Sequence, residues 1–425
     1  MPQAAAQGAT AATAKHMADN QKSDGPQEEG RDGGMSLSGT NLERAGDHNQ
    51  RVTLHAIRVN GPITRTDLAD ITGLTPPAIA NITKRLLQDN LIKEAGRVRG
   101  ARGQPPIKLV INPDSWFSIG VNVDRDHITL VVLDFLGAVR ARSSREIAFA
   151  LPATVQSFFQ RSIGQLLDKA AINASQLVGI GVAFPDDIQR AGLPDQPEDY
   201  SAWGSVSVDQ LFTQSLKVPV FVENDAAAAA MGEMQFGRGH QYQSFFYILI
   251  TAALGGGLVI DGNYFRGANG RSAELGWLRG HDGFSRTRQL QNIVSLSALY
   301  SRLATQGYRV SSPRGLTRLD EGGRNLVNEW VETSVEALLE TLLAINCLIN
   351  PQAVLIGGRL PASIVEDLAR RLNERLQPYA ATMPAIAPVE RAVMSDDAPA
   401  VGAAILPFTH RLLPTRAALM KVSGG

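Results

Sequence analysis

The sequence predicts an α/β protein in which an N-terminal winged helix-turn-helix precedes two related α/β lobes. Residues 49–113 combine three short helical patterns, two strand patterns and an excess of positive charge. After residue 113, strand patterns alternate with helical ones and each half opens with a β-hairpin, which indicates two repeated units with a cleft between them. We expect a disordered tail at 1–48, the helix-turn-helix domain at 49–113, lobes at 114–232 and 233–395, and at 396–425 a C-terminal helix that packs back on the first lobe, followed by a tail.

Composition excludes several classes of protein. The 425 residues are 44% hydrophobic and include 40 glycines, enough for two or three cores of ordinary domain size. The single cysteine, Cys347, excludes a disulfide framework and a zinc site made of several thiolates. No apolar run reaches the roughly 18 residues of a membrane span and no apolar segment follows the N-terminus, so we expect a cytoplasmic protein without a membrane partner.

The N-terminal part differs in charge from the rest of the chain. Residues 1–48 hold only Leu37 and Leu42 as aliphatic anchors, which predicts disorder. Residues 49–113 contain 10 Lys/Arg against 4 Asp/Glu, a net charge of +6, whereas the whole chain has a net charge of zero. A basic block beside an acidic remainder is typical of a module that binds a polyanion.

Three helical patterns in this block predict a helix-turn-helix. The first covers 52–59, and the second, 64–72, begins with a capping threonine and ends at Gly73. The third, 75–90, starts with two prolines and keeps its isoleucines and leucines on one face, so its polar and basic side chains point outward and can enter a major groove. The DNA contacts predicted from these helices are Thr64, Arg65, Thr75, Pro77, Asn81, Lys84 and Arg85.

Two strand patterns after the third helix predict a wing. Residues 91–94 and 107–111 flank a Gly- and Arg-rich segment. Arginines spaced by glycines can follow a phosphate backbone, and the sequence Arg-Gly-Gln-Pro fits a narrow minor groove; the alternative is a solvated charged hairpin. The wing residues predicted to contact DNA are Arg97, Arg99, Arg102 and Gln104.

The centre of the α/β region is the stretch from Val218 to Glu233. A β-branched run breaks at Glu223-Asn224-Asp225 and continues into an alanine-rich helical pattern, so these polar groups lie where a strand ends and ligands bind in open α/β sheets. The alternative is that Asp225 only caps the helix. Further strands are expected at 116–123, 128–135, 178–184, 245–252, 257–260, 263–265 and 353–357, and further helices at 151–171, 325–349 and 366–376.

Four segments resemble the ROK family, which joins repressors and sugar kinases on a two-lobed, actin-like ATPase fold. They are TGLTPPAIANITKRLLQDNLI, VPVFVENDAAAAAMGE, LGGGLVIDGNYFRGANGRSAELGW and INPQAVLIGGRL. The resemblance implies that Asp225 stands at the position of the kinases' general base, and that Asn224 and Glu274 bind a sugar. It also likens Gly255-Gly256-Gly257 to a phosphate loop and Gly357-Gly358 to an adenosine contact.

Departures from the family pattern argue against catalysis. The kinases carry an Asp followed by Gly-Gly-Thr in the first hairpin, whereas this chain has Asn122 and Asp124-Arg125-Asp126. Without the glycines the backbone amides cannot face a phosphate, and each aspartate repels one by about 4 kcal/mol at 4 Å and an effective dielectric near 20. Arg125 offsets one of these charges at most, so we expect that ATP does not bind there.

The family's zinc motif is also missing. Trp277 replaces the histidine of that motif, and residues 280–289 contain no cysteine, so we expect no metal and no cofactor. Ala227 stands where many relatives have asparagine. The ligand-binding residues predicted for the cleft are therefore Asn224, Asp225, Glu274 and Trp277, whose indole offers a face for stacking a sugar ring.

These observations predict a DNA-binding transcriptional regulator, a repressor that senses a sugar or sugar derivative without phosphorylating it. Its expected partners are double-stranded operator DNA, the carbohydrate effector and further copies of itself in a homodimer or homotetramer. One alternative is a sugar kinase with a DNA-binding appendage and Asp225 as general base. Another is a regulator whose lobes have lost effector binding and serve as a dimerisation scaffold.

Overall fold

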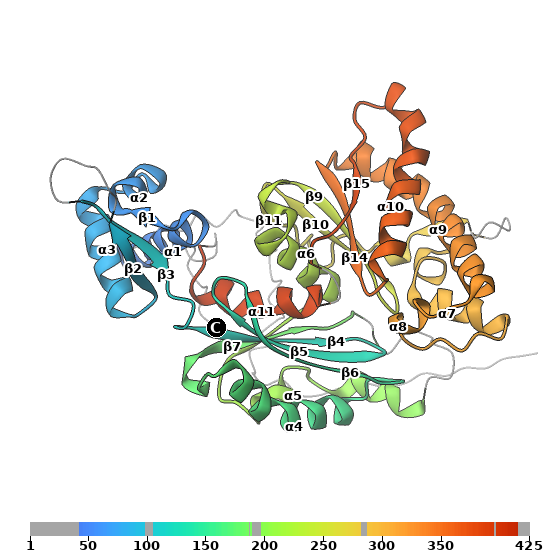
Figure 1. Ribbon diagram of the computed structural model, residues 1–425, viewed down its shortest axis with the longest axis horizontal. Coiled ribbons are helices and arrows are strands. Elements are labelled where there is room, and N and C mark those ends of the chain that lie inside the picture. Colours follow the sequence, from blue (N-terminus) through green and yellow to red (C-terminus); the bar gives the residue numbers. More distant parts are fainter. Residues whose placement is uncertain are drawn as a thin grey trace, which may run out of the picture. The chain divides into compact units, whose positions relative to one another are not determined.

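The computed structural model describes residues 42–97, 105–186, 188, 197–281, 287–394 and 397–414 (Figure 1). Its first domain consists of helices α1 (Leu42–Asn60), α2 (Arg65–Thr72) and α3 (Pro76–Gln88) and strands β1 (Ile63–Thr64), β2 (Ile92–Arg97) and β3 (Ile107–Ile111). The strands pair in the order β1-β3-β2. The helices and the wing strands that the sequence predicts are present.

Helix α1 begins at Leu42, inside the segment expected to be a disordered tail. These first residues continue a helix whose later residues Leu54 and Ile57 are buried. An ion pair one turn apart, Arg51 Nε to Asp47 Oδ2 at 2.9 Å, supports this extension.

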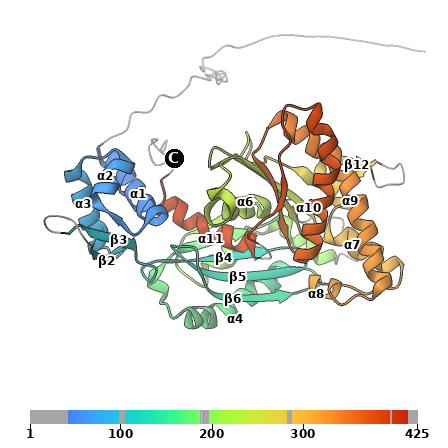
Figure 2. The same cartoon turned by 45° about the horizontal axis from the view of Figure 1, so that its top comes forward.

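The first lobe contains a five-stranded sheet in the order β6-β5-β4-β7-β8. Its strands are β4 (Phe117–Val123), β5 (His127–Asp134), β6 (Val139–Glu146), β7 (Leu177–Ala183) and β8 (Val220–Glu223). Helices α4 (Pro152–Ala170) and α5 (Gln210–Thr213) cover one face and α11 (Ala398–Arg411) the other (Figure 1). Figure 2 shows α4 and α11 on opposite sides of this sheet. Strand β6 is absent from the sequence prediction because its residues, VRARSSRE, are those of an exposed edge strand without apolar alternation.

The second lobe repeats this layout in the order β11-β10-β9-β14-β15. Its strands are β9 (Phe245–Ile250), β10 (Leu254–Ile260), β11 (Asn263–Tyr264), β14 (Ala353–Gly358) and β15 (Val389–Arg391), with a separate hairpin of β12 (Arg279–His281) and β13 (Thr287–Gln289). Its helices are α7 (Leu296–Thr305), α8 (Pro313–Leu316), α9 (Glu321–Leu348) and α10 (Ala362–Leu376). Among the described helices, none is both long and apolar enough to cross a membrane.

Helix α6 (Asp225–Phe236) packs against both β10 and α11, and this position explains its alanines. A Cβ added to Gly402 of α11 would lie 1.7 Å from the carbonyl oxygen of Ala228. Added at Gly255 and Gly257 of β10, it would lie 2.7 and 2.5 Å from the Cβ atoms of Ala226 and Ala230. The three consecutive glycines of β10 thus lie within a strand, where Gly255 and Gly257 allow α6 to approach closely, while a Cβ on Gly256 would lie 2.2 Å from the carbonyl oxygen of Ala273.

Candidate functional site

Asn224 and Asp225, which follow β8, have different roles at the start of α6. The side-chain oxygen of Asn224 accepts hydrogen bonds from the backbone N–H groups of Ala226 and Ala227, at 2.9 and 3.1 Å, so Asn224 is the N-cap of α6. Asp225 is the first helical residue, and its Oδ1 accepts from Ala226 at 2.8 Å. Capping is therefore the role of Asn224, which leaves Oδ2 of Asp225 for other partners.

The structure brings the four predicted ligand residues to one pocket between the lobes. Asn224 and Asp225 lie at the start of α6, whereas Glu274 and Trp277 come from the loop and short 3-10 helix after β11. Trp277 is 47% exposed, so its ring is open to a ligand. The remaining residues of this pocket are Arg125, Asp186, Ala253, Leu254, Gly255 and Gln291.

Three of these pocket residues carry polar groups that the sequence analysis did not assign to the ligand site: Arg125, Asp186 and Gln291. Asp186 accepts a hydrogen bond from Nδ2 of Asn224 at 3.1 Å and thereby fixes the orientation of that amide. Arg271, just outside the pocket lining, bonds through Nε to Oε1 of Glu274 at 2.6 Å and lies 3.9 Å from Asp186. Asp186 follows β7, the neighbour of β8, so its place at the end of a parallel strand was a signal available in the sequence.

The carboxyl group of Asp225 has an unusual pKa. Its pKa is raised from 3.8 to about 7, chiefly by burial and also by the nearby charge of Asp124, although the charge of Arg125 and the hydrogen bond from Ala226 lower it. Near neutral pH the group is thus present in both protonation states. A carboxyl of this kind can accept hydrogen bonds from sugar hydroxyls when ionised and donate one when protonated.

This pKa predicts a pH-dependent affinity. We expect binding of a neutral sugar to weaken as the pH falls from 8 to 6, by up to about tenfold per pH unit below the pKa, because ionised Asp225 accepts from two hydroxyls. Calorimetric titration across this range measures the effect. Arg125→Gln should move its midpoint to higher pH, since the charge of Arg125 lowers the pKa of Asp225. An affinity that is constant from pH 8 to 6 would contradict the prediction.

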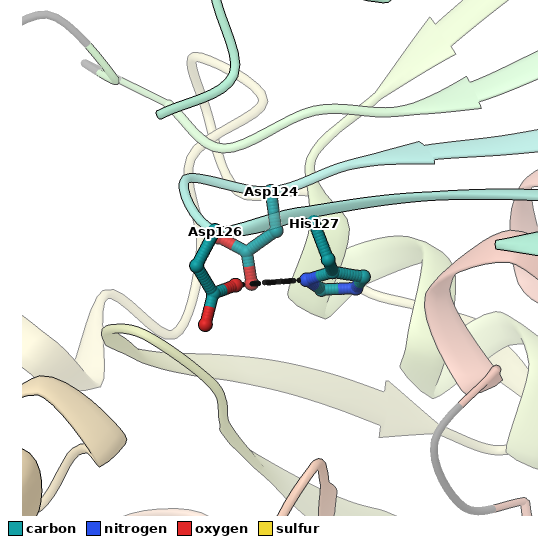
Figure 3. Close-up of side chains that lie close together, drawn as sticks. All are labelled: Asp124, Asp126 and His127. Atoms are coloured by element: carbon teal, nitrogen blue, oxygen red, sulfur yellow. Dashed lines mark hydrogen bonds and ion pairs between the residues drawn. The ribbon is translucent and has the colours of Figure 1, made fainter. Parts of the chain in front are cut away.

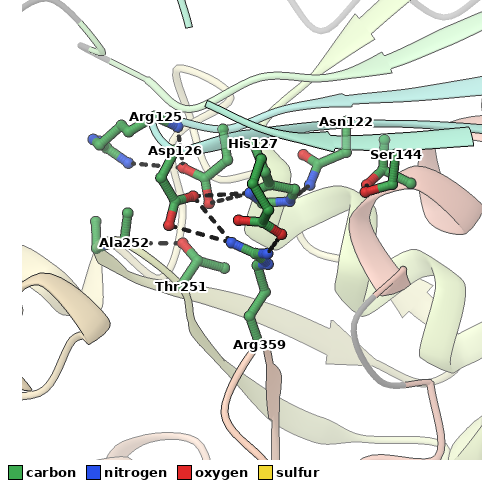
Figure 4. A network of polar contacts seen from close by, with 12 residues as sticks. Asn122, Arg125, Asp126, His127, Ser144, Thr251, Ala252 and Arg359 are labelled. Atoms are coloured by element: carbon green, nitrogen blue, oxygen red, sulfur yellow. Dashed lines mark hydrogen bonds and ion pairs between the residues drawn. The ribbon is translucent and has the colours of Figure 1, made fainter. Parts of the chain in front are cut away.

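A polar network occupies the turn between β4 and β5 (Figure 4). Nδ1 of His127 lies 2.9 Å from Oδ1 of Asp126, and its Nε2 lies 3.0 Å from Nδ2 of Asn122. Arg359, which follows β14, donates through Nη1 to both oxygens of Asp126 at 3.2 Å and through Nη2 to Glu146. From the sequence, only Arg125 was expected to offset the charges of Asp124 and Asp126. In the structure Arg359 also does so, because it pairs with Asp126.

Asp124, Asp126 and His127 also place three potential metal-ligand atoms within 4.8 Å of one another (Figure 3). Asp126 is already bonded to His127 and Arg359, and a cation would have to replace a guanidinium that carries the same sign of charge. We therefore interpret the group as an ion-pair network. The glycines likened to an adenosine contact, Gly357 and Gly358, line an adjoining cavity of about 330 Å³, which Arg359 of the network also lines together with Arg314 and Arg391.

The predicted DNA-binding residues fall into two sets. Thr75, Pro77, Asn81, Lys84 and Arg85 are exposed on or just before α3, whose buried face holds Ile79, Ile82 and Leu86. Thr64 is instead buried, and its hydroxyl donates to Asp67 and caps α2, while Nε of Arg65 donates to Thr83 at 2.8 Å. Arg97 is exposed at the end of β2, and Arg99, Arg102 and Gln104 lie outside the described residues.

Comparison with known families identifies both parts of the chain. Residues 118–409 match the model of the ROK family, and residues 47–93 match that of a winged helix-turn-helix DNA-binding domain. The chain belongs to the ROK family. This confirms the predicted fold, with a winged helix-turn-helix ahead of two lobes of the sugar-kinase type, and gives this ROK protein the domain composition of a transcriptional regulator.

Several relatives of this ROK protein have names. It is 25% identical to the DNA-binding transcriptional dual regulator NagC of Escherichia coli K12, over 77% of this chain and 84% of that protein. It is 28% identical to the xylose repressor of Bacillus subtilis 168, over 54% of this chain and 59% of the repressor. An uncharacterized protein, y4fQ, of Sinorhizobium fredii is 29% identical over 85% of this chain and 90% of its own length.

Solved structures show the same fold. A ROK family transcriptional regulator described as a homolog of the E. coli MLC protein aligns with a TM-score of 0.63 and 21% identity, over 86% of this chain and 96% of that one. A ROK family glucokinase from Streptomyces griseus, in complex with glucose and AMPPNP, aligns with a TM-score of 0.52 and 22% identity, over 68% and 98%. These likenesses concern the fold and leave the chemistry of the pocket to its own residues.

Proposed function

We propose that this ROK-family regulator represses transcription from operator DNA, and that a sugar or sugar derivative bound between its lobes releases it without being phosphorylated. The observation that carries the proposal is the pocket of Asn224, Asp225, Glu274 and Trp277, at the N-terminal end of α6. An acid, an amide and an open aromatic face are the groups that bind a polyhydroxylated ring. The relatives named as xylose repressor and N-acetylglucosamine repressor support sugars as the effector class.

Helix α6 offers a direct route from the pocket to the DNA-binding domain. Its N-terminus carries Asn224 and Asp225, and its other end, about 18 Å away at 1.5 Å per residue, carries Gln235 and Phe236. There Nη2 of Arg58, in α1, donates to Oε1 of Gln235 at 2.5 Å, and the guanidinium lies 5.5 Å from the centre of the Phe236 ring. Because nearly all of α6 is buried against β10 and α11, a shift at the pocket would move the helix as a unit.

A dimer or tetramer would turn this movement into a change in DNA affinity. Two recognition helices bind an operator tightly only when their spacing matches that of the half-sites. A ligand that alters the placement of the modules therefore weakens binding. The coupling is reciprocal, so operator DNA should weaken sugar binding by the same factor.

The proposal is tested by measuring that linkage. A duplex selected from a random pool is titrated with the protein in fluorescence anisotropy, with and without glucose, xylose or N-acetylglucosamine. At least one sugar should weaken DNA binding about tenfold or more, and DNA should weaken binding of that sugar equally. Sugar binding without any effect on DNA affinity would contradict the proposal. DNA binding without affinity for any carbohydrate would support the alternative of lobes that act only as a dimerisation scaffold.

One observation favours the kinase alternative. A carboxyl with a pKa of about 7 in the pocket suits a general base for a sugar hydroxyl. Against it, the β4–β5 turn is filled by paired charges where a phosphate loop would need free amides. Turnover of ATP with any of these sugars at about 1 s⁻¹ or faster, abolished by Asp225→Asn, would show that the protein is a sugar kinase. It would overturn the proposal that the sugar is bound without being phosphorylated.

A further inference from the structure

Arg359 crosses the cleft next to the ligand pocket, since its partner Asp126 adjoins Arg125, a residue of the pocket lining. It follows β14 of the second lobe, where its backbone N–H donates to Ile250 of the adjacent strand at 3.0 Å. Its guanidinium bonds to both oxygens of Asp126, in the β4–β5 turn, and to Glu146, at the end of β6 (Figure 4). Both acids belong to the first lobe, so one side chain connects the lobes.

Arg359 and Asp126 form an ion pair in which both groups are charged at neutral pH. Arg359 is 8% exposed, and a guanidinium with two carboxylate partners satisfies its donors in a fixed geometry. Although burial raises the pKa of Asp126, the hydrogen bond from His127 and the charge of Arg359 lower it overall, which keeps the carboxylate ionised at neutral pH. Removing one partner would leave a buried charge unpaired, and that is the costly way to break such a contact.

Two other described ion pairs between the lobes, Arg266 with Glu223 and Arg271 with Asp186, are more exposed. Arg266, after β11, pairs with Glu223 of β8 at 2.5 Å, but the arginine side chain is 55% exposed and therefore screened by solvent. Of these described ion pairs, that of Arg359 is thus the buried one, and its guanidinium reaches the β4–β5 turn, where the aspartates replace the expected glycine loop. The departures from the family pattern by which we expect a phosphate site to be lost also supply Asp126 as the acid that Arg359 binds.

We infer that Arg359 is a positioning residue that clasps the two lobes together through Asp126 and Glu146, so that ligand in the neighbouring pocket closes the cleft about a protein ion pair. The inference rests on the proposed function for its ligand, but the clasp itself is a property of the unliganded protein. The guanidinium of Arg359 thus provides a buried link between the two lobes. Ligand binding then needs no second small molecule to set the angle of the lobes.

The clasp is tested with Arg359→Gln, which keeps a polar side chain of similar length and removes the charge. Arg375→Gln is the matched control, since Arg375 pairs with Glu336 within the second lobe and both are largely exposed. In the full-length, unliganded protein, hydrogen exchange of the Asp124 amide, which bonds to His127, should be at least about tenfold faster in Arg359→Gln than in wild type or control. Sugar affinity should fall roughly tenfold in the same variant only.

A second pair of variants keeps the inference testable if Arg359→Gln folds poorly. Glu146→Gln removes the half-exposed partner and should raise the same exchange rate by a smaller factor. Asp126→Asn should raise it as much as Arg359→Gln, and the double variant should add little to either, as expected for two ends of one interaction. Exchange rates equal to those of wild type and control would overturn the clasp. A wild type that binds none of the sugars would count against the proposed function, and the exchange rates would still decide the clasp.

Discussion

Asp225→Asn is expected to abolish sugar binding and at the same time to raise the free energy of unfolding at pH 8. The buried carboxyl has a pKa of about 7 in the folded protein, above its ordinary value of 3.8. Ionisation therefore costs stability above pH 7, and this cost disappears as the pH falls toward 4, where the folded protein keeps the group neutral. The asparagine can still accept the hydrogen bond from Ala226 through its oxygen.

The gain in stability has an upper bound. A shift of about three pKa units corresponds to roughly 4 kcal/mol, so a gain of about 1–4 kcal/mol at pH 8 is expected from urea unfolding. The gain should shrink toward zero near pH 4. Asp168→Asn, an exposed acid on α4, is the control and should change neither stability nor sugar binding. A destabilised Asp225→Asn at pH 8 would assign the residue to the structure of the fold and not to a ligand site.

Replacing both Lys84 and Arg102 with alanine is expected to weaken operator binding by about 100-fold or more in 0.1 M salt. Lys84 is exposed on α3, and Arg102 comes from the basic segment between β2 and β3 that the sequence predicts to follow the DNA backbone. Each lost phosphate contact reduces the slope of log K against log salt by about 0.9, so the double variant should lose a slope of about 1.8 for each bound DNA-binding module.

A control variant measured over the same salt concentrations separates the loss of these DNA contacts from a general loss of positive charge. Lys169→Ala removes an exposed lysine from α4 in the first lobe and should leave both the affinity and the salt slope unchanged. Equal affinity of wild type and the double variant at every salt concentration would remove these two residues from the DNA interface. Circular dichroism at the same concentrations checks that α3 remains folded.

Local patterns in the sequence were sufficient for much of the fold. The strand patterns at 116–123 and 128–135 predicted β4 and β5, and the break at Glu223-Asn224-Asp225 predicted the junction of β8 and α6. These elements are buried and apolar, so each segment carries its own signal. The exposed β6 carries none, and the glycines of β10 are an ambiguous signal because close packing and a phosphate loop call for the same residue.

In the candidate site, too, some features have a local sequence signal and others do not. Asn224, Asp225, Glu274 and Trp277 could be chosen from the printed sequence, since strand ends and family motifs mark them. Their meeting in one pocket, the capping role of Asn224 and the raised pKa of Asp225 depend on burial and on neighbours from other elements. Arg359 and Asp126 are 233 positions apart, and no local pattern relates them. Side-chain type and spacing specify helices, strands and charge, whereas partners across a cleft exist only after the chain has folded back on itself.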